Sequence, residues 1–352
     1  MRGRTTAGLS SFDCRLSQAN TASGLDYWNN WIEVKKAMQT DGSDGASEHT
    51  PLGDDAQHSI WLATFDQYRS LLFSIAYRML GSVADAEDML QDTFIRWQQS
   101  ADAEILNPRA FLVTVISRLC ITHLQSARVQ REEYVGQWLP EPIVTDPAGD
   151  PFGMIKLDES ISMAFLVLLE RLTPVERAVF LLREVFEYEY SEIATILGQT
   201  EANCRQILHR ARQHVSTVRP RFEVSEEKQN DLLRRFLEAV ETGETEQLLA
   251  LLSHDVVLHS DGGGKGAAVP NPIRGSSNVA RGILGSYRRF VPQTLVRRFV
   301  RVNGEAGLVN YLNGKPHSVL TLEIADGQIR SIYIVTNPEK LSHLPELSAD
   351  PN

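Results

Sequence analysis

Polar side chains able to bind DNA are concentrated between Tyr190 and Arg212. Apolar residues at helical spacing predict a first helix there. Gly198 predicts the turn that ends this helix, because glycine enters the left-handed conformation without steric cost. A second helix is predicted to begin at Thr200, whose hydroxyl can cap it. Polar groups on that helix can contact base edges and phosphates in a DNA groove. The candidate DNA-reading residues are Thr200, Glu201, Asn203, Arg205, Gln206, His209, Arg210 and Arg212.

The overall composition limits where DNA could bind. The chain has 352 residues and a formal net charge of −10, so any contact with DNA must be local. An ordinary helix pair in an all-α core remains the alternative. Cys14, Cys120 and Cys204 are scattered and have no metal-site or disulfide spacing. The sequence also lacks a signal-peptide pattern and a bilayer-length apolar run. We therefore expect a cytoplasmic protein without membrane association, and we predict no cofactor and no metal.

Three helical segments precede the candidate DNA reader, between Ile60 and Gln130. Gly81 is predicted to end the first helix, Ser82 to cap the second, and Pro108 to begin the third. The second helix is acidic on one face. The third, between Ile105 and Arg131, carries basic residues and no acid. Each charged surface alone is more typical of an ordinary solvated helix, but the two together, followed by a helix-turn-helix, are harder to explain in that way.

Changes in composition predict five segments along the chain. Residues 1–57 predict a mostly disordered extension, and residues 58–131 and 155–220 predict two all-α domains, the second with the helix-turn-helix. Residues 132–154, which include WLPEP and four prolines, predict an extended, irregular linker. Residues 226–346 contain helices and a strand, DVVLHS, followed by four alternating strands with Asn-Gly and Asp-Gly turns. This order predicts an α+β cone, in which a curved sheet wraps around a helix.

Over residues 60–220 the chain resembles bacterial RNA polymerase sigma factors of the extracytoplasmic-function group. AYRMLGSVADAEDMLQDTFIRW is similar to the helix that docks on core polymerase, and NPRAFLVTVISRLCITHL is similar to the segment that captures the −10 promoter element. Residues 190–213 are similar to the reader of the −35 element. The resemblance implies a transcription initiation factor that performs no reaction, with core RNA polymerase and promoter DNA as its partners.

The resemblance also implies roles for the two charged helices. The implied polymerase-binding residues are Asp85, Glu87, Asp88, Asp92 and Arg96. Single-stranded DNA binds by stacking over a cationic groove, which suits the basic helix. The implied −10 residues are Arg109, Phe111, Ser117, Arg118, Thr122, His123 and Arg128. Phe111 is equally compatible with a place in the core.

Three short motifs narrow the resemblance to a sigma-J-like subgroup with a fused C-terminal domain of the SnoaL type, an NTF2-like fold. They are WLPEP at 138–142, DGGGK at 261–265 and NPEKL at 337–341. The subgroup implies that this domain regulates the protein and that DGGGK meets the WLPEP linker. The implied contact residues are Trp138, Leu139, Pro140, Asp261, Gly262, Gly263, Gly264 and Lys265.

A different function for the C-terminal domain remains open. SnoaL-type folds include cyclases that use a His/Asp pair as general acid and base, and His259 and Asp261 lie together at the predicted end of a strand. The alternative is therefore a SnoaL-like enzyme, or a sensor with an unknown small ligand in its cone, that carries a DNA-binding half. We favour a docking or regulatory domain, because the sequence offers no second convergent catalytic group.

Overall fold

A computed structural model describes residues 54–100, 105–132, 134–145, 161–215, 225–290 and 295–347. For residues 54–60, 127–132 and 290 it describes only the backbone. The predicted disordered extension, residues 1–57, lies outside the described residues, apart from its last four positions. Among the described residues, no helix is both long enough and apolar enough to cross a membrane.

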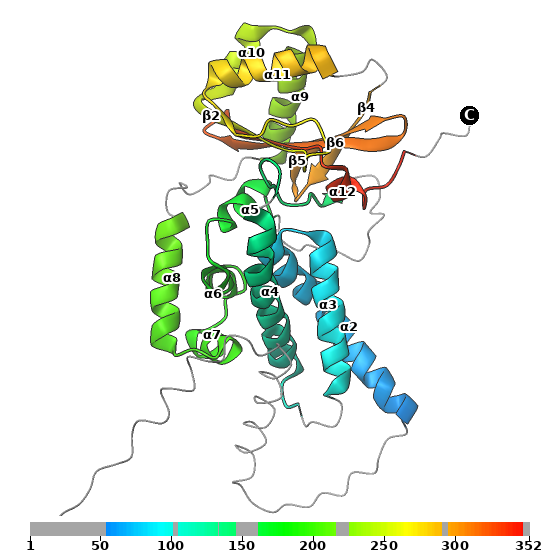
Figure 1. Ribbon diagram of the computed structural model, residues 1–352, viewed down its shortest axis with the longest axis vertical. Helices are drawn as coiled ribbons and strands as arrows, with labels where there is room; N and C mark the ends of the chain where they lie inside the picture. Colours follow the sequence, from blue (N-terminus) through cyan, green and yellow to red (C-terminus); the bar gives the residue numbers. More distant parts are fainter. Residues whose placement is uncertain are drawn as a thin grey trace, which may run out of the picture. The chain divides into compact units, whose positions relative to one another are not determined.

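The first helical part consists of α2 (Asp54–Leu80), α3 (Val83–Gln99) and α4 (Pro108–Glu132), shown in Figure 1. Gly81 follows α2 in the left-handed conformation, with φ of 68°. Ser82 caps α3 by accepting a hydrogen bond from the backbone N–H of Asp85 over 3.2 Å. These helix boundaries confirm the predicted break at Gly81, the cap at Ser82 and the helix start at Pro108.

The second helical part contains α5 (Met163–Leu169), α6 (Pro174–Glu184), α7 (Tyr190–Leu197) and α8 (Glu201–Val215). Gly198 ends α7 with φ of 65°, and Thr200 Oγ1 accepts from the backbone N–H of Asn203 over 3.2 Å. The predicted helix-turn-helix is therefore confirmed, with its glycine turn and its threonine cap. Ile193 and Ile196 are the residues of α7 that become buried.

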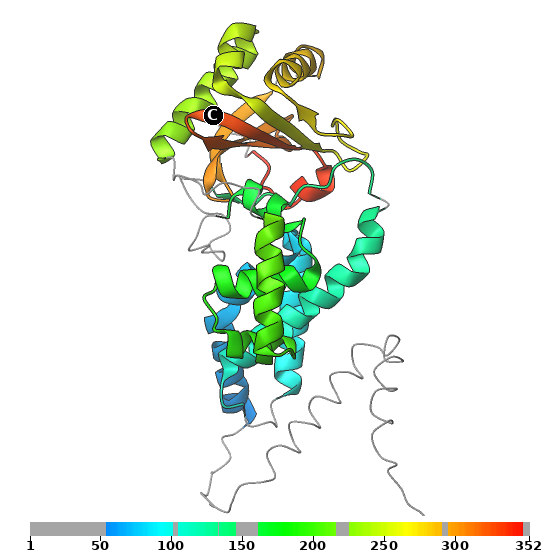
Figure 2. The same ribbon diagram turned by 90° about the vertical axis from the view of Figure 1, so that its left-hand side faces the viewer.

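The helices of the C-terminal part are α9 (Glu226–Thr242), α10 (Thr245–Leu251), α11 (Ser276–Phe290) and the short α12 (Pro338–Leu341). Its strands are β2 (Leu252–Asp261), β3 (Ile273–Arg274), β4 (Val296–Val302), β5 (Glu305–Leu312), β6 (Lys315–Ala325) and β7 (Gln328–Val335). The helices α9, α10 and α11 cover one face of the sheet, as both ribbon views show (Figures 1 and 2). The α+β architecture expected of an NTF2-like domain is confirmed.

The sheet is larger than the strand DVVLHS and the four alternating strands that the sequence predicts. Within the described part of the chain, seven strands lie in the order β1-β4-β5-β6-β7-β2-β3, where β1 is Val144–Thr145, and β2 pairs in parallel with β7. The hairpin turns Asn303-Gly304, Asn313-Gly314 and Asp326-Gly327 have positive φ at both residues, as the predicted type I′ turns require. The first strand, β1 (Val144–Thr145), comes from the linker and pairs antiparallel with β4. The linker is therefore part of the sheet at this point, which corrects its prediction as wholly irregular.

Two hydrophobic cores lie on opposite faces of this sheet. Residues such as Phe236 and Leu248 fill the core between the sheet and α9, α10 and α11. The core on the other face contains strand residues together with Leu139 and Val144 of the linker and Met163 of α5. The linker and the second helical part therefore cover a sheet face that would otherwise expose apolar side chains.

Candidate DNA-binding face and linker contact

The candidate −35 residues lie along the outer side of α8. Seven of the eight are exposed, and Asn203 is half-buried. Apolar residues of α8 at helical spacing, Cys204, Ile207, Leu208 and Ala211, turn inward, which leaves the polar side outside. Thr200, Glu201, Arg205, Gln206, His209, Arg210 and Arg212 are thus accessible to a DNA groove.

Two arginines of α8 have different surroundings. The Arg205 guanidinium lies over the Tyr190 ring at 4.8 Å and pairs with Glu201 at 2.7 Å, near the start of the helix. Arg212, in the last turn, pairs with Glu184 of α6 at 2.7 Å. The Tyr190 ring and the Glu201 carboxylate limit the positions that the Arg205 guanidinium can take. This is the property needed for directional contacts with a base.

The acidic face of α3 is solvent-accessible at three of its predicted positions. Glu87, Asp88 and Asp92 are exposed, whereas Asp85 is half-buried and lies 3.6 Å from His123 of α4. Partial burial lowers the pKa of the Arg96 guanidinium from its usual value, although the nearby Asp92 carboxylate opposes this effect. Three carboxylates thus remain available at the rim of this helix.

The predicted −10 residues on α4 are not all on its surface. Ser117 is buried, which corrects its prediction as a DNA contact in this conformation. The reason is helical spacing, because Ser117 shares a face with the buried residues Val113, Cys120 and Leu124. Phe111 is half-buried, and the centre of its ring lies 5.8 Å from that of Trp97, so it is neither fully exposed nor part of the buried core.

The remaining −10 candidates differ in their exposure and contacts. Arg109 and Thr122 are exposed, and the Arg109 guanidinium lies 5.2 Å from the Tyr188 ring. His123 is half-buried beside Asp85. The side chain of Arg128 lies outside the described residues. Only part of the predicted surface is therefore accessible.

Arg118 connects the candidate −10 helix to the helix-turn-helix. Its guanidinium donates to the backbone carbonyl of Ile196 over 2.8 Å and to that of Thr195 over 3.3 Å. Both carbonyls belong to the last turn of α7, where a cation interacts favourably with the helix dipole. The Arg118 side chain is therefore engaged within the protein in this conformation, and α4 and α7 are in contact.

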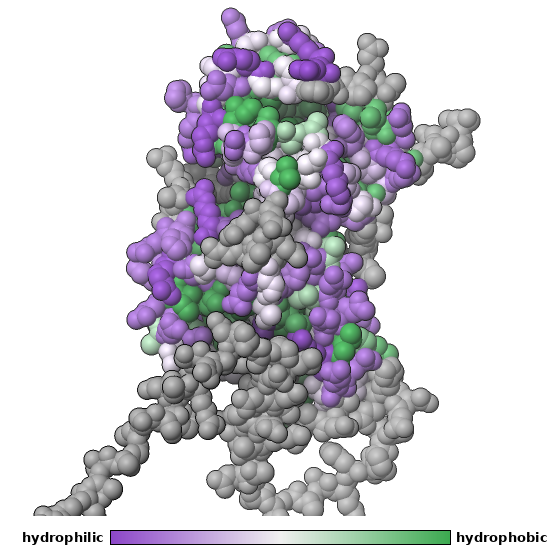
Figure 3. All heavy atoms as spheres, in the orientation of Figure 1, coloured by the Kyte–Doolittle hydropathy of each residue, from purple (hydrophilic) through white to green (hydrophobic). Residues whose placement is uncertain are grey.

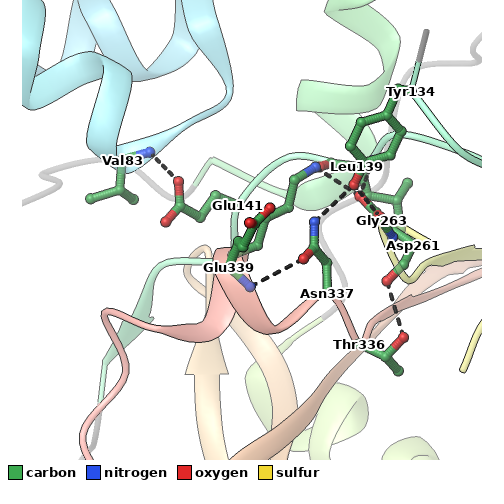
Figure 4. Close-up of polar contacts among 10 residues, drawn as sticks. Val83, Tyr134, Leu139, Glu141, Asp261, Gly263, Thr336, Asn337 and Glu339 are labelled. Carbon is green, nitrogen blue, oxygen red and sulfur yellow. Dashed lines mark hydrogen bonds and ion pairs between the residues drawn. The ribbon is translucent and has the colours of Figure 1, made fainter. Parts of the chain in front are cut away.

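Asp261 accepts four hydrogen bonds, two from the linker and two from the C-terminal domain itself (Figure 4). Its fully buried carboxylate accepts from the Tyr134 hydroxyl at 2.6 Å, the Leu139 N–H at 2.8 Å and the Gly263 N–H at 3.0 Å. It also accepts from the Lys340 ammonium at 2.7 Å. Burial and this carboxylate raise the pKa of Tyr134 above its usual value, so the phenol remains a donor.

Lys340, from NPEKL, is the second group that binds the linker. Its ammonium also donates to the Leu139 carbonyl, and it lies 4.1 Å from the centre of the Trp138 ring. A cation over an aromatic face is attracted by the ring quadrupole. The three short motifs thus meet at one place. Lys340 of NPEKL supplies the cation, and Asp261 of DGGGK supplies the buried anion. WLPEP supplies the backbone of Leu139 and the ring of Trp138.

Close contacts explain why positions 262–264 of the DGGGK loop are glycines. Gly263 has φ of 55°, and a Cβ there would lie 2.4 Å from the Asn337 side chain. A Cβ on Gly262 would lie 2.4 Å from the backbone oxygen of Gly266, and one on Gly264 would lie 3.2 Å from Val135 of the linker. Lys265 is exposed and pairs with Glu339. Pro140, in the linker, is buried.

Glu141 of the linker, which sequence reasoning did not select, binds α3. Its carboxylate accepts from the Val83 N–H at 2.7 Å, and its backbone N–H donates to the Gly81 carbonyl at 2.8 Å. The Tyr77 hydroxyl donates to the Glu141 carbonyl at 2.6 Å and accepts from the Asn303 amide at 2.7 Å. Glu141 thus satisfies the free N–H at a helix start, and Tyr77 joins the linker to the C-terminal domain.

The His/Asp pair of the enzyme alternative is already engaged. The carboxylate of Asp261 is saturated by the four donors described above. The His259 ring stacks on Tyr333 at 5.1 Å, and its Nδ1 lies 2.6 Å from the Gln137 amide nitrogen. Burial, and next the Arg274 cation, lower the pKa of His259 to about 4. Among the described residues, no group of three or more His, Cys, Asp or Glu side chains is placed to hold a metal.

Comparison with known proteins gives a consistent result. The family models for Sigma-70 region 2 and Sigma-70, region 4 match residues 64–129 and 162–215. ECF RNA polymerase sigma factor SigJ of Mycobacterium tuberculosis strain H37Rv is 36% identical over 297 residues, which cover 81% of this chain and 94% of SigJ. The probable ECF RNA polymerase sigma factor SigI of strain CDC 1551 is 32% identical over 291 residues, covering 82% and 97%. The crystal structure of the M. tuberculosis SigJ protein matches with a TM-score of 0.66 and 34% identity, covering 80% of this chain and 98% of that one.

Proposed function

This chain belongs to the extracytoplasmic-function RNA polymerase sigma factors, and we propose that its C-terminal domain restrains it by clamping the linker. A sigma factor directs core RNA polymerase to promoters, and it acts by binding rather than by catalysis. We propose that Glu87, Asp88 and Asp92 contact polymerase, that exposed residues of α8 read the −35 element, and that α4 holds the −10 element.

The contact between α4 and α7 supports a restrained state. The −10 and −35 elements lie roughly 25 base pairs apart, which is about 85 Å at 3.4 Å per pair. Helices in direct contact cannot reach two elements so far apart. The Arg118 hydrogen bonds to Ile196 and Thr195 must therefore break when both elements are bound.

The linker contacts support the clamp itself, and the buried Asp261 is the observation that carries the proposal. One carboxylate is shared by the linker N–H of Leu139, the Tyr134 hydroxyl and the Lys340 ammonium. Glu141 and Tyr77 attach the same linker to the first helical part. We infer that the domain works by docking rather than by catalysis, since the Asp261 carboxylate has no capacity left to act as a base.

In vitro transcription with core polymerase on one promoter tests the clamp. Trp138→Ala and Asp261→Asn should each raise transcription several-fold, because each weakens the restrained state. The double variant should do no more than the stronger single variant, because both act on one contact. Asp326→Asn is the matched control, since Asp326 is an exposed turn residue in the left-handed conformation, which asparagine adopts readily. Wild-type or reduced transcription by both folded single variants would overturn restraint by this domain.

A further inference from the structure

Basic residues are concentrated in one segment of the C-terminal domain. Residues 262–322 contain nine Lys and Arg residues and a single acid, Glu305, in a chain whose net charge is −10. Lys265, Arg297, Arg301 and Lys315 pair with carboxylates from outside the segment, so the positive charge open to a polyanion lies on other residues of the segment. This segment includes α11, β4 and β5.

The geometry of α11 places part of this charge on one exposed stripe. Asn278, Arg281, Gly285 and Arg288 follow one another at spacings of three and four residues, and all four are exposed. Arg281 and Arg288 are two helical turns apart, about 10.5 Å along the axis. Arg297 and Arg301 of β4 pair with Glu241 and Glu226, whereas no ion pair seen among the described residues involves Arg281 or Arg288. The Arg288 guanidinium lies beside Gly243 at the end of α9. Hydrophilic side chains gather over α10 and α11 in Figure 3.

The chemistry of the stripe favours phosphate over a protein surface. Within 276–289, the part of α11 whose side chains are described, the exposed residues are serine, asparagine, arginine and glycine, with no apolar or aromatic side chain among them. Protein interfaces depend on buried apolar or aromatic anchors, whereas phosphates are bound by arginine, serine and asparagine. A Cβ on Gly285 would meet nothing within 4 Å, so the middle of the stripe is open to a close approach.

The path of the chain keeps this domain near promoter DNA. The −35 reading helix α8 ends at Val215, and α9 begins at Glu226. The intervening chain spans at most about 40 Å when fully extended. The start of α9 therefore remains within about a dozen base pairs of the −35 reading helix, even after the linker clamp has opened. At such short range a weak contact gains from a high effective concentration.

We propose that the stripe around Arg281 and Arg288 binds the phosphate backbone of promoter DNA immediately upstream of the −35 element. The contact adds affinity without reading sequence, and it depends on salt because counterions are released from the DNA. This role is separate from the linker clamp, which involves the other face of the sheet.

The experiment compares two promoter fragments bound by holoenzyme assembled from core polymerase and the full chain. One fragment ends at the upstream edge of the −35 element, and the other continues about 20 base pairs further, beyond the reach allowed by the tether. Wild-type protein should bind the longer fragment several-fold more tightly. Arg281→Ala and Arg288→Ala should each reduce that advantage, and each should lower the slope of log affinity against log salt by about 0.9 on the longer fragment only.

Lys315→Ala is the control, because it removes one exposed positive charge at the start of β6 in the same domain. It should behave as wild type on both fragments. Equal binding of the two fragments by wild-type protein would overturn the proposal. Equal losses of affinity on both fragments for the arginine variants would also overturn it. Weaker binding of these variants to core polymerase in the absence of DNA would overturn it too, because it would assign the stripe to polymerase. Failure of the linker clamp would leave the fragment comparison unchanged, so the two ideas are tested separately.

Discussion

The backbone N–H of Leu139 donates to the carboxylate of Asp261 over 2.8 Å, although 122 positions of sequence separate the two residues. The side chain of Leu139 is fully buried among strand residues of the C-terminal domain. The same linker residue thus contributes a hydrogen bond to a buried charge and an apolar group to a core. Because the carboxylate is also the partner of Lys340, the linker and the end of the domain depend on one another.

Replacing Asp261 by asparagine should loosen the linker while preserving side-chain shape. The Tyr134 hydroxyl and the Leu139 N–H donate to different oxygens of Asp261, so the amide NH2, which cannot accept, leaves one of the two without an acceptor. Lys340 also loses its charged partner. Breaking a buried ion pair costs about 3–5 kcal/mol. We expect Asp261→Asn to approach that loss in the free energy of unfolding, with faster amide hydrogen exchange at Leu139, Ile143 and Val144. Asp326→Asn should change neither quantity, and unaltered exchange in Asp261→Asn would show that the apolar contacts alone hold the linker.

Much of the fold follows from local signals in the sequence. The caps at Ser82 and Thr200, the turn at Gly198 and the three glycine-containing hairpins each depend on residues close together in the chain. The parallel pairing of β2 with β7 depends on a contact between distant residues, and no local pattern encodes it. The two-residue strand β1 is likewise too short to give an alternating pattern, and it forms only because β4 is beside it.

The candidate sites were predictable to different degrees for similar reasons. The polar side of α8 follows from helical spacing, which equally indicates that Ser117 lies on the buried side of α4. No sequence pattern marked Glu141 or Tyr77 as a contact residue, because each depends on a partner far away in the chain. Glu141 binds the start of α3, and Tyr77 binds Asn303. Lys340 was visible within NPEKL, but its position over the Trp138 ring requires the folded domain.

Reversing charge at Asp88 and Asp92 should weaken the association with core polymerase. Both side chains are exposed on α3, so lysine fits there without disturbing the core. Rim charges mainly affect association rates and salt dependence. We expect Asp88→Lys/Asp92→Lys to co-purify poorly with core polymerase at moderate salt, with an unchanged circular dichroism spectrum. Gln98→Lys, also exposed on α3, controls for added charge, and normal co-purification of the double variant would exclude this face from the polymerase interface.

Arg205 and Arg212 should affect promoter binding differently. Arg205 lies near the start of α8 with its guanidinium over Tyr190, whereas Arg212 lies in the last turn beside Glu184. We expect Arg205→Ala to cost about 1–3 kcal/mol on the −35 element and to relax preference at one or two base pairs. Arg212→Ala should weaken binding to all sequences and lower the salt slope. Binding assays on specific and scrambled DNA distinguish base reading from phosphate binding. An equal loss of affinity for both DNAs in Arg205→Ala would show that Arg205 contacts only phosphate.

His259 should make the C-terminal domain less stable as the pH falls. Burial lowers the pKa of His259 to about 4 in the folded protein, whereas an unfolded histidine has a pKa of about 6.5. Between these values the unfolded chain binds a proton that the folded chain does not, so stability is lost as pH falls through this window. The loss from one such group is at most about 1.4 kcal/mol per pH unit. The stability from neutral His259 is fully present only above about pH 6.5.

The measurement is the free energy of unfolding between pH 7 and pH 4, for wild type and His259→Phe. Phenylalanine keeps a ring against Tyr333 and cannot titrate, although it loses the contact with Gln137. The variant should therefore be less stable at pH 7 but show a shallower decline as the pH falls. His317→Phe, an exposed histidine on β6, controls for removing a histidine elsewhere in the domain. If the free energies of unfolding of His259→Phe and wild type decline in parallel, the folded protein does not exclude the proton from His259. Acid would then not release Gln137 of the linker through this ring.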